Sequence, residues 1–310
     1  MDYETLRACL RGQWRRVAEI PRAKRSQTPK TDSIGLGRAA FTWVWQDEKL
    51  WVPILCKDEY LAQCLCYFGV LDGIQHLLVD WLVVHAESAD SECMKLTSRP
   101  HAWRGFLLRA IISALFSHDS ANSADAALRC FFTIEEQRKA SLSSAGKHEI
   151  PPVTFRLTAA TVKIICELVR GHCPNTDPAL YDRFATFYQD YNGDRAEVRP
   201  LRLAALSLYH PTRPSATATV DFMRSQLSHA DDAGLLHFRQ HHLSVLADRE
   251  LPRFFTRLKN LSDEGDSKWV WEQYQRLWSL KQSSLKDEST PQFANAAISF
   301  KPLSIRKIRC

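Results

Sequence analysis

The sequence predicts an all-α protein, built as an irregular array of antiparallel helical hairpins that forms a short α-solenoid or a helical bundle. Glycine occurs 11 times in 310 residues, about half of its usual ~7%, whereas sandwiches, barrels and dinucleotide-binding folds need glycine at many tight turns. Hydrophobic residues make up 45% of the chain, which excludes general disorder. Apolar residues recur at helical spacing, and no Asn-Gly or Asp-Gly pair is flanked by alternating apolar residues as in a β-hairpin.

Residues 1–38 are predicted to form a basic N-terminal helix followed by a linker. Its apolar positions, Leu6, Leu10, Trp14 and Val17, recur at helical spacing, and residues 1–40 contain nine Lys or Arg against four Asp or Glu. Three interpretations stay open: a cleaved mitochondrial transit helix, a nuclear-import patch at residues 21–25, and a surface helix that belongs to the fold. The acids Asp2 and Glu4 suit the first turn of a retained helix, which predicts that Trp14 is substantially buried against a later helix.

Residues 39–140 are predicted to form an N-terminal helical subdomain. The aromatic-rich segment 41–55 fits either a short helix or a pair of strands. Two hairpins follow, pairing residues 59–68 with 72–87 and residues 102–116 with 124–140. The stripe that begins at Ile74 predicts that Leu78 and Trp81 are buried, and Ser123 is placed to cap the helix that follows it.

The Ser- and Pro-containing residues 141–153 are predicted to be a linker, followed by a C-terminal hairpin array over residues 154–281. Its hairpins pair residues 159–170 with 178–191, 200–209 with 215–228, and 234–247 with 249–261, and a lone helix spans 266–280. Asp177 precedes Pro178 and is expected to cap that helix. Residues 282–310 are predicted to be a basic, flexible tail. The excess positive charge lies at the two ends of the chain, which argues against a dedicated nucleic-acid-binding domain.

The segment from Tyr60 to Leu78 places a glycine-containing turn between two amphipathic helices, and the hairpins that start near residues 200, 234 and 266 are spaced by 34 and 32 residues. In shape, residues 59–281 resemble tetratricopeptide and pentatricopeptide helical-hairpin repeats. The sequence departs from both patterns because Ile74 and Trp81 stand where these families place small residues. The resemblance implies an extended helical surface that binds a protein partner or RNA.

The sequence contains no recognisable catalytic or metal-binding constellation. His237 and His241 lie one helical turn apart, a spacing that suits zinc, but Phe238 stands where the zincin motif has its glutamate. The nine cysteines form no CxxC pair and suit structural thiols in a reducing compartment. We therefore expect no catalytic residues, no metal and no cofactor.

Tryptophans are the remaining signal, since exposed indole rings anchor interfaces and stack on bases. The candidate interaction residues are Trp43, Trp45, Trp51, Trp269 and Trp271. The leading hypothesis is a non-catalytic scaffold or adaptor that binds a protein partner through a helical groove. The alternatives are an RNA-binding helical-repeat protein of an organelle and an α-helical toroid enzyme.

The location expected for this protein is intracellular, cytoplasmic or mitochondrial, with the nucleus also open. No membrane insertion is expected. The most apolar stretch, residues 64–84, contains Asp72, His76 and Asp80, which a membrane helix would hold only at a cost of several kcal/mol.

Overall fold

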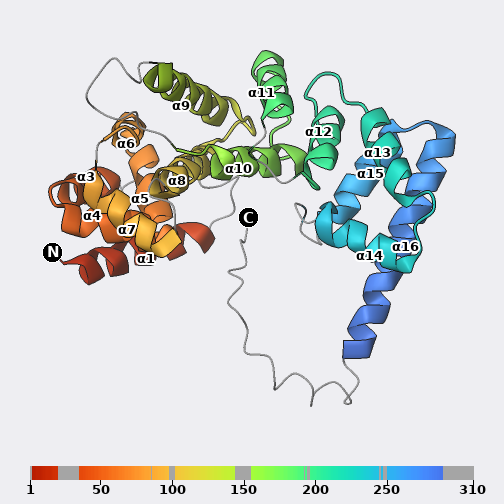
Figure 1. The fold of residues 1–310 in the computed structure, drawn as a ribbon, viewed down its shortest axis with the longest axis horizontal. Coiled ribbons are helices and arrows are strands. Elements are labelled where there is room, and N and C mark those ends of the chain that lie inside the picture. The colour runs from red at the N-terminus through yellow and green to blue at the C-terminus, as the bar shows by residue number, and fades with distance from the viewer. Residues whose placement is uncertain are drawn as a thin grey trace. The chain divides into compact units, whose positions relative to one another are not determined.

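The computed structural model describes residues 2–19, 35–84, 86–97, 102–143, 155–191, 193, 196–243, 246 and 250–288. Over these ranges the chain is helical and contains no strand (Figure 1), so the all-α prediction is confirmed. The predicted linkers 21–38 and 141–153 and the predicted tail 282–310 lie largely outside the described residues.

The chain divides into two compact units, which are described separately. The first comprises Met1–Ile164 and His172–Gly193, and the second comprises Ile165–Gly171 and Asp194–Cys310. The helices of the first unit are α1 (Tyr3–Glu19), α3 (Leu36–Trp45), α4 (Glu48–Lys57), α5 (Glu59–Leu71), α6 (Gln75–Trp81), α7 (Glu87–Thr97), α8 (Ala102–His118), α9 (Asp125–Ser143) and α11 (Pro178–Asp190). Helix α10 (Thr158–Val169) begins in the first unit and ends in the second.

Helices α5 and α8 form the core of the first unit. They pack against each other more extensively than any other pair among the described helices. Helix α8 is apolar around most of its circumference and buries eleven of its residues, from Trp103 to Phe116. A helix that is hydrophobic on all sides belongs in the interior, which explains why α4, α6, α7 and α9 also contact α8.

The N-terminal helix α1 packs against α5, as expected for a retained helix. Leu6 and Leu10 are fully buried. Trp14 contacts α5 as predicted, with its ring edge-on to Tyr67 and ring centroids 4.5 Å apart, but it is half-buried and not substantially buried. The carboxylate of Asp58 caps α5 by accepting from the Leu61 amide at 3.0 Å.

The same Asp58 carboxylate fixes the position of α1. It forms an ion pair with Arg7, whose Nε lies 2.9 Å from Oδ2, and accepts a hydrogen bond from Arg11 at 3.1 Å. Two of the arginines that suggested a transit helix therefore attach α1 to the core.

Segment 41–55, for which helix and strands were both open, is helical. Helix α3 approaches α5 closely at Gly37, where a Cβ atom would lie 2.2 Å from the carbonyl carbon of Phe68. Asp72, just after α5, holds the start of α3 by accepting from the amides of Gly35 and Arg38, each at 3.0 Å. Contacts of α3 with α5 and Asp72 thus accompany the helical state of a segment whose local pattern fitted both a helix and a pair of strands.

The predicted helix over residues 72–87 is wrong in extent. Helix α6 ends at Trp81 and a further helix, α7, begins at Glu87. The buried side chain of Arg104 explains the break, because it donates to the carbonyls of Leu82 and Val84 at 3.0 and 2.8 Å and to Asp90 of α7 at 2.7 Å. These carbonyls bond to a side chain instead of to a further helical turn. The prediction that Leu78 and Trp81 are buried is confirmed, since both are 0% exposed.

Helix α11 packs against α9 and belongs to the first unit. The contact is aromatic: Phe131 of α9 meets Phe184 and Phe187 of α11 with ring centroids 5.8 and 5.1 Å apart. The two compact units consequently divide at residues 164–194 rather than at the linker 141–153. The predicted caps are present, because Ser123 accepts from the Asp125 amide at 3.0 Å and Asp177 accepts from the Ala179 amide at 2.9 Å.

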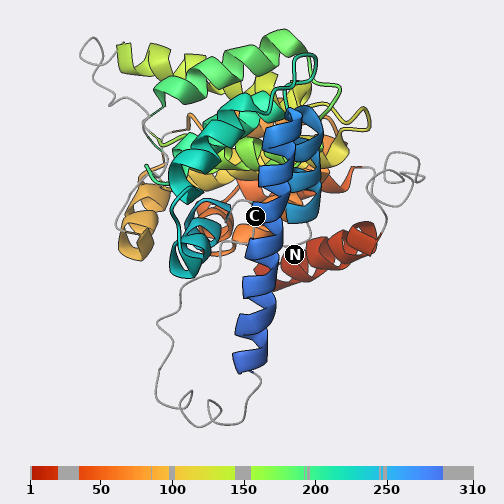
Figure 2. The same cartoon turned by 90° about the vertical axis from the view of Figure 1, so that its right-hand side faces the viewer.

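The second unit contains α12 (Arg199–Leu208), α13 (Thr217–Leu227), α14 (Asp232–His241), α15 (Leu251–Leu261) and α16 (Glu264–Glu288). Helices α12 and α13 form the predicted hairpin, and α15 pairs with the 25-residue helix α16, drawn in blue in Figure 2. Helix α14 also packs on α16, so both α14 and α15 lie against this helix.

Candidate functional site

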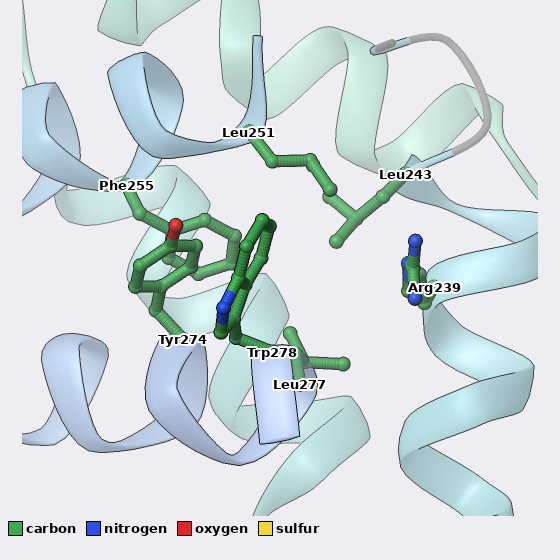
Figure 3. Close-up of a pocket in the computed structure, with 7 residues that line it drawn as sticks. All are labelled: Arg239, Leu243, Leu251, Phe255, Tyr274, Leu277 and Trp278. Carbon is green, nitrogen blue, oxygen red and sulfur yellow. The ribbon is translucent and has the colours of Figure 1, made fainter. Parts of the chain in front are cut away.

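A small apolar hollow lies between α14, α15 and α16 in the second unit. We call it the α16 hollow. It is lined by Arg239, Leu243, Leu251, Phe255, Tyr274, Leu277 and Trp278. In the view of Figure 3 the indole of Trp278 lies between Phe255 and Tyr274 on one side and Arg239 and Leu243 on the other.

The floor and the rim of the α16 hollow differ in exposure. The floor consists of Leu243, Leu251, Phe255 and Leu277, none of which is more than 7% exposed. At the rim, Trp278 is 40% exposed. The side chain of Arg239 is half-buried at the edge. A large aromatic ring over a buried aliphatic floor, with an arginine beside it, has the composition of an interface anchor point.

A row of aromatic rings continues from the hollow along α16. Tyr274 lies between Phe255 and Trp271 with ring centroids 5.0 and 5.1 Å apart, and Trp278 follows at 6.2 Å. Helical spacing places these rings on one side of α16, because residues three and four apart are neighbours on a helix surface.

Each of the two predicted tryptophans of α16 has a cation over its ring. Lys259 Nζ lies 4.8 Å from the centroid of the Trp271 ring, which belongs to the row, and the guanidinium of Arg224 lies 5.4 Å from that of Trp269. Trp269 is two positions from Trp271 and lies on a different side of the helix. Both predicted interaction residues are half-buried, whereas Trp278 is the exposed member of the row.

The predicted N-terminal tryptophans occupy three different environments. Trp51 is 3% exposed and packs on Trp81 and Trp103 with ring centroids 5.5 and 5.7 Å apart, so its ring is part of the core and offers no docking surface. Trp43 is half-buried. Trp45 is 40% exposed but stacks on Phe41 at 5.7 Å. The first unit thus exposes parts of the Trp43 and Trp45 rings and buries that of Trp51.

The histidines of α14 lie together, as their spacing predicts. The rings of His237 and His241 have centroids 4.2 Å apart. Within the described ranges, no group of three or more His, Cys, Asp or Glu side chains is arranged to hold a metal ion. The neighbouring His242 packs against Phe222 and Phe238, and its burial lowers the pKa of its imidazole below the usual 6.5.

The sequence analysis missed the residues that form the floor of the α16 hollow. Leu243 and Leu251 lie at the ends of segments that were assigned to a single hairpin, and Phe255 belongs to the apolar stripe of α15. Only tertiary packing brings them beneath Trp278. The one signal present in the sequence was the row of aromatic residues in the last helix.

Comparison with models of known protein families, with curated proteins and with solved structures finds no match for this chain. None of the helices in the described part of the chain combines the length and the apolar character needed to cross a membrane.

Proposed function

We propose that this protein is a non-catalytic helical adaptor that binds a protein partner, and that the α16 hollow receives an apolar side chain of that partner. The observation that supports this proposal is the 40% exposed indole of Trp278 above a floor of buried leucine and phenylalanine. Exposing a tryptophan beside such a floor favours association. The lining of the α16 hollow consists of apolar and aromatic side chains with one arginine, which suits binding rather than proton transfer.

The partner surface that fits this site is an amphipathic helix or an extended segment with one large aliphatic or aromatic anchor and an acidic residue close to it. The anchor would pack against the exposed indole of Trp278 at the hollow, and the acidic residue would approach Arg239. Aromatic and arginine side chains in well-packed sites dominate binding energies.

Trp278→Ala tests the proposal. The full-length chain is immobilised, incubated with native extract of its own cells, and the stoichiometric partner is then purified and titrated calorimetrically. Because truncating an interface anchor costs about 2 kcal/mol or more, Trp278→Ala should weaken binding by about 30-fold or more.

Leu261→Ala is the matched control, since Leu261 is 38% exposed on the same unit but is not among the hollow's lining residues. It should bind like the wild type. Recovery of no stoichiometric partner, or equal affinity of the wild type and Trp278→Ala, would contradict the proposal. Loss of binding in Trp45→Ala alone would move the site to the first unit.

RNA binding is the second candidate function, and the cation–aromatic pairs Lys259–Trp271 and Arg224–Trp269 favour it, because basic and aromatic side chains together bind unpaired bases. Filter binding across a salt series separates the two functions. An RNA reader shows affinity that falls steeply with salt, and this affinity should drop in Trp271→Ala. An adaptor retains no RNA at moderate salt.

A further inference from the structure

Two cysteines distant in sequence meet in the first unit. Cys56 lies in the last turn of α4, and Cys93 lies in the middle of α7. Their sulfur atoms are 3.0 Å apart although the residues are separated by 37 positions. No CxxC spacing in the sequence predicts this pair, which forms because α4 packs against α7.

The two thiols differ in access. Cys93 is 0% exposed, whereas Cys56 is partly exposed and also lies 3.6 Å from the carbonyl oxygen of Ala89. A reagent from solution therefore reaches the sulfur of Cys56 first, and Cys93 stands directly behind it. This is the arrangement of an attacking thiol with a resolving thiol.

The contact between the sulfurs determines which thiol ionises first. Hydrogen bonding to Cys56 lowers the pKa of the Cys93 thiol below its usual value, whereas the hydrogen bond to Cys93 and burial raise the pKa of the Cys56 thiol. Because the thiolate is the form that attacks disulfides, Cys56 needs a base, and the Cys93 thiolate 3.0 Å away is placed to take its proton during the attack.

We propose that Cys56 and Cys93 are a dithiol modification site that forms a reversible intramolecular disulfide by exchange with a low-molecular-weight disulfide such as oxidised glutathione. The Cys56 sulfur attacks one sulfur of the reagent while its proton passes to the Cys93 thiolate, the reagent's S–S bond breaks, and one glutathione leaves as thiolate. The leaving thiolate takes the proton from Cys93, and the Cys93 thiolate then attacks the Cys56 sulfur and releases the second glutathione. The two protein protons pass to the two leaving thiolates, so one disulfide is reduced for each one formed.

The geometry needs only a small adjustment for this step. A disulfide bond is about 2.05 Å long, so the sulfurs must approach by about 1 Å, which rotation of the two side chains can supply. The new bond would join α4 to α7 and close a loop that contains α5 and α6. It would restrict the unfolded chain and raise the thermal midpoint of the first unit. This site is independent of the α16 hollow, which lies in the other unit.

Peptide mapping after exposure to oxidised glutathione tests the proposal on the reduced full-length chain. The wild type should yield a Cys56–Cys93 cross-linked peptide, whereas the exposed Cys9, used as the internal reference, should form only a mixed disulfide with glutathione. Cys93→Ser should stop at glutathione on Cys56. Cys56→Ser should leave Cys93 unmodified, because that sulfur is buried.

A second measurement needs no variant. A trivalent arsenical, which bridges two thiols held within reach of each other, should protect Cys56 and Cys93 of the folded wild type from alkylation and leave Cys9 reactive. Persistent glutathione on Cys56 in the wild type, or protection of Cys9 equal to that of the pair, would overturn the proposal. So would reaction of Cys93 in Cys56→Ser at the rate of Cys9, with circular dichroism confirming that the variant is folded.

Discussion

Replacing Trp81 by alanine is the sharpest test of the packing of the first unit. Its indole is 0% exposed and lies at the centre of an aromatic cluster. Three rings meet it nearly edge-on: Phe41 at 5.3 Å, Trp45 at 5.4 Å and Trp51 at 5.5 Å between centroids. Trp81 thereby joins the end of α6 to both α3 and α4.

Two effects of opposite sign determine the size of the loss. A tryptophan-to-alanine change in a core costs about 3–5 kcal/mol, and the three edge-to-face ring contacts place Trp81 at the upper end of that range. The indole Nε1, however, is buried with no hydrogen-bond partner among the described residues, and an unsatisfied donor of this kind costs about 1–3 kcal/mol. Because the substitution also removes that donor, we expect a net loss of about 3 kcal/mol.

Trp81→Phe separates the two effects, because it keeps a ring in the cluster and removes the unsatisfied donor. It should lose less than about 1.5 kcal/mol. The assay is differential scanning calorimetry of the full-length chain, with the transitions of the two units fitted separately. For a unit of this size a loss of about 3 kcal/mol lowers the thermal midpoint by about 6–12 °C. A loss below about 1 kcal/mol for Trp81→Ala would refute this account of the cluster.

Three further predictions follow from close contacts and from charge. Gly37→Ala should destabilise the first unit by about 1–3 kcal/mol in the calorimetric assay, because the new Cβ atom would lie 2.2 Å from the Phe68 backbone. Gly12→Ala is the control: a Cβ atom there has no neighbour within 4 Å, so stability should be equal or slightly higher. Arg104→Ala should cost about 3–5 kcal/mol in urea unfolding, since it leaves two carbonyls without their donor and removes the ion pair of the half-buried Asp90, to which the Trp103 indole would still donate, and Arg104→Lys should recover only part of this. Burial lowers the pKa of His242 in the folded state, so the unfolded chain binds more protons in acid. The second unit should therefore lose stability as the pH falls through about 6.5 and below. Urea midpoints measured from about pH 8 to about pH 5 should fall less in His242→Gln than in the wild type.

The secondary structure of this protein was largely determined by local sequence. Low glycine content, apolar stripes at helical spacing and the capping residues Ser123 and Asp177 predicted most helices, because caps and periodicity depend on residues a few positions apart. The same stripes predicted the burial of Leu78 and Trp81, and the spacing of leucines in the first helix predicted its packing.

What lay beyond local sequence depends on residues that are distant along the chain. The break between α6 and α7 depends on hydrogen bonds from Arg104, some 20 residues away from the carbonyls it binds, and the helical state of segment 41–55 depends on packing against α5 and the core. Likewise, the floor under Trp278 and the meeting of Cys56 with Cys93 are products of helix packing. A sequence pattern records the face that each helix buries, but which helices bury their faces against each other is decided by the sum of contacts over the whole unit.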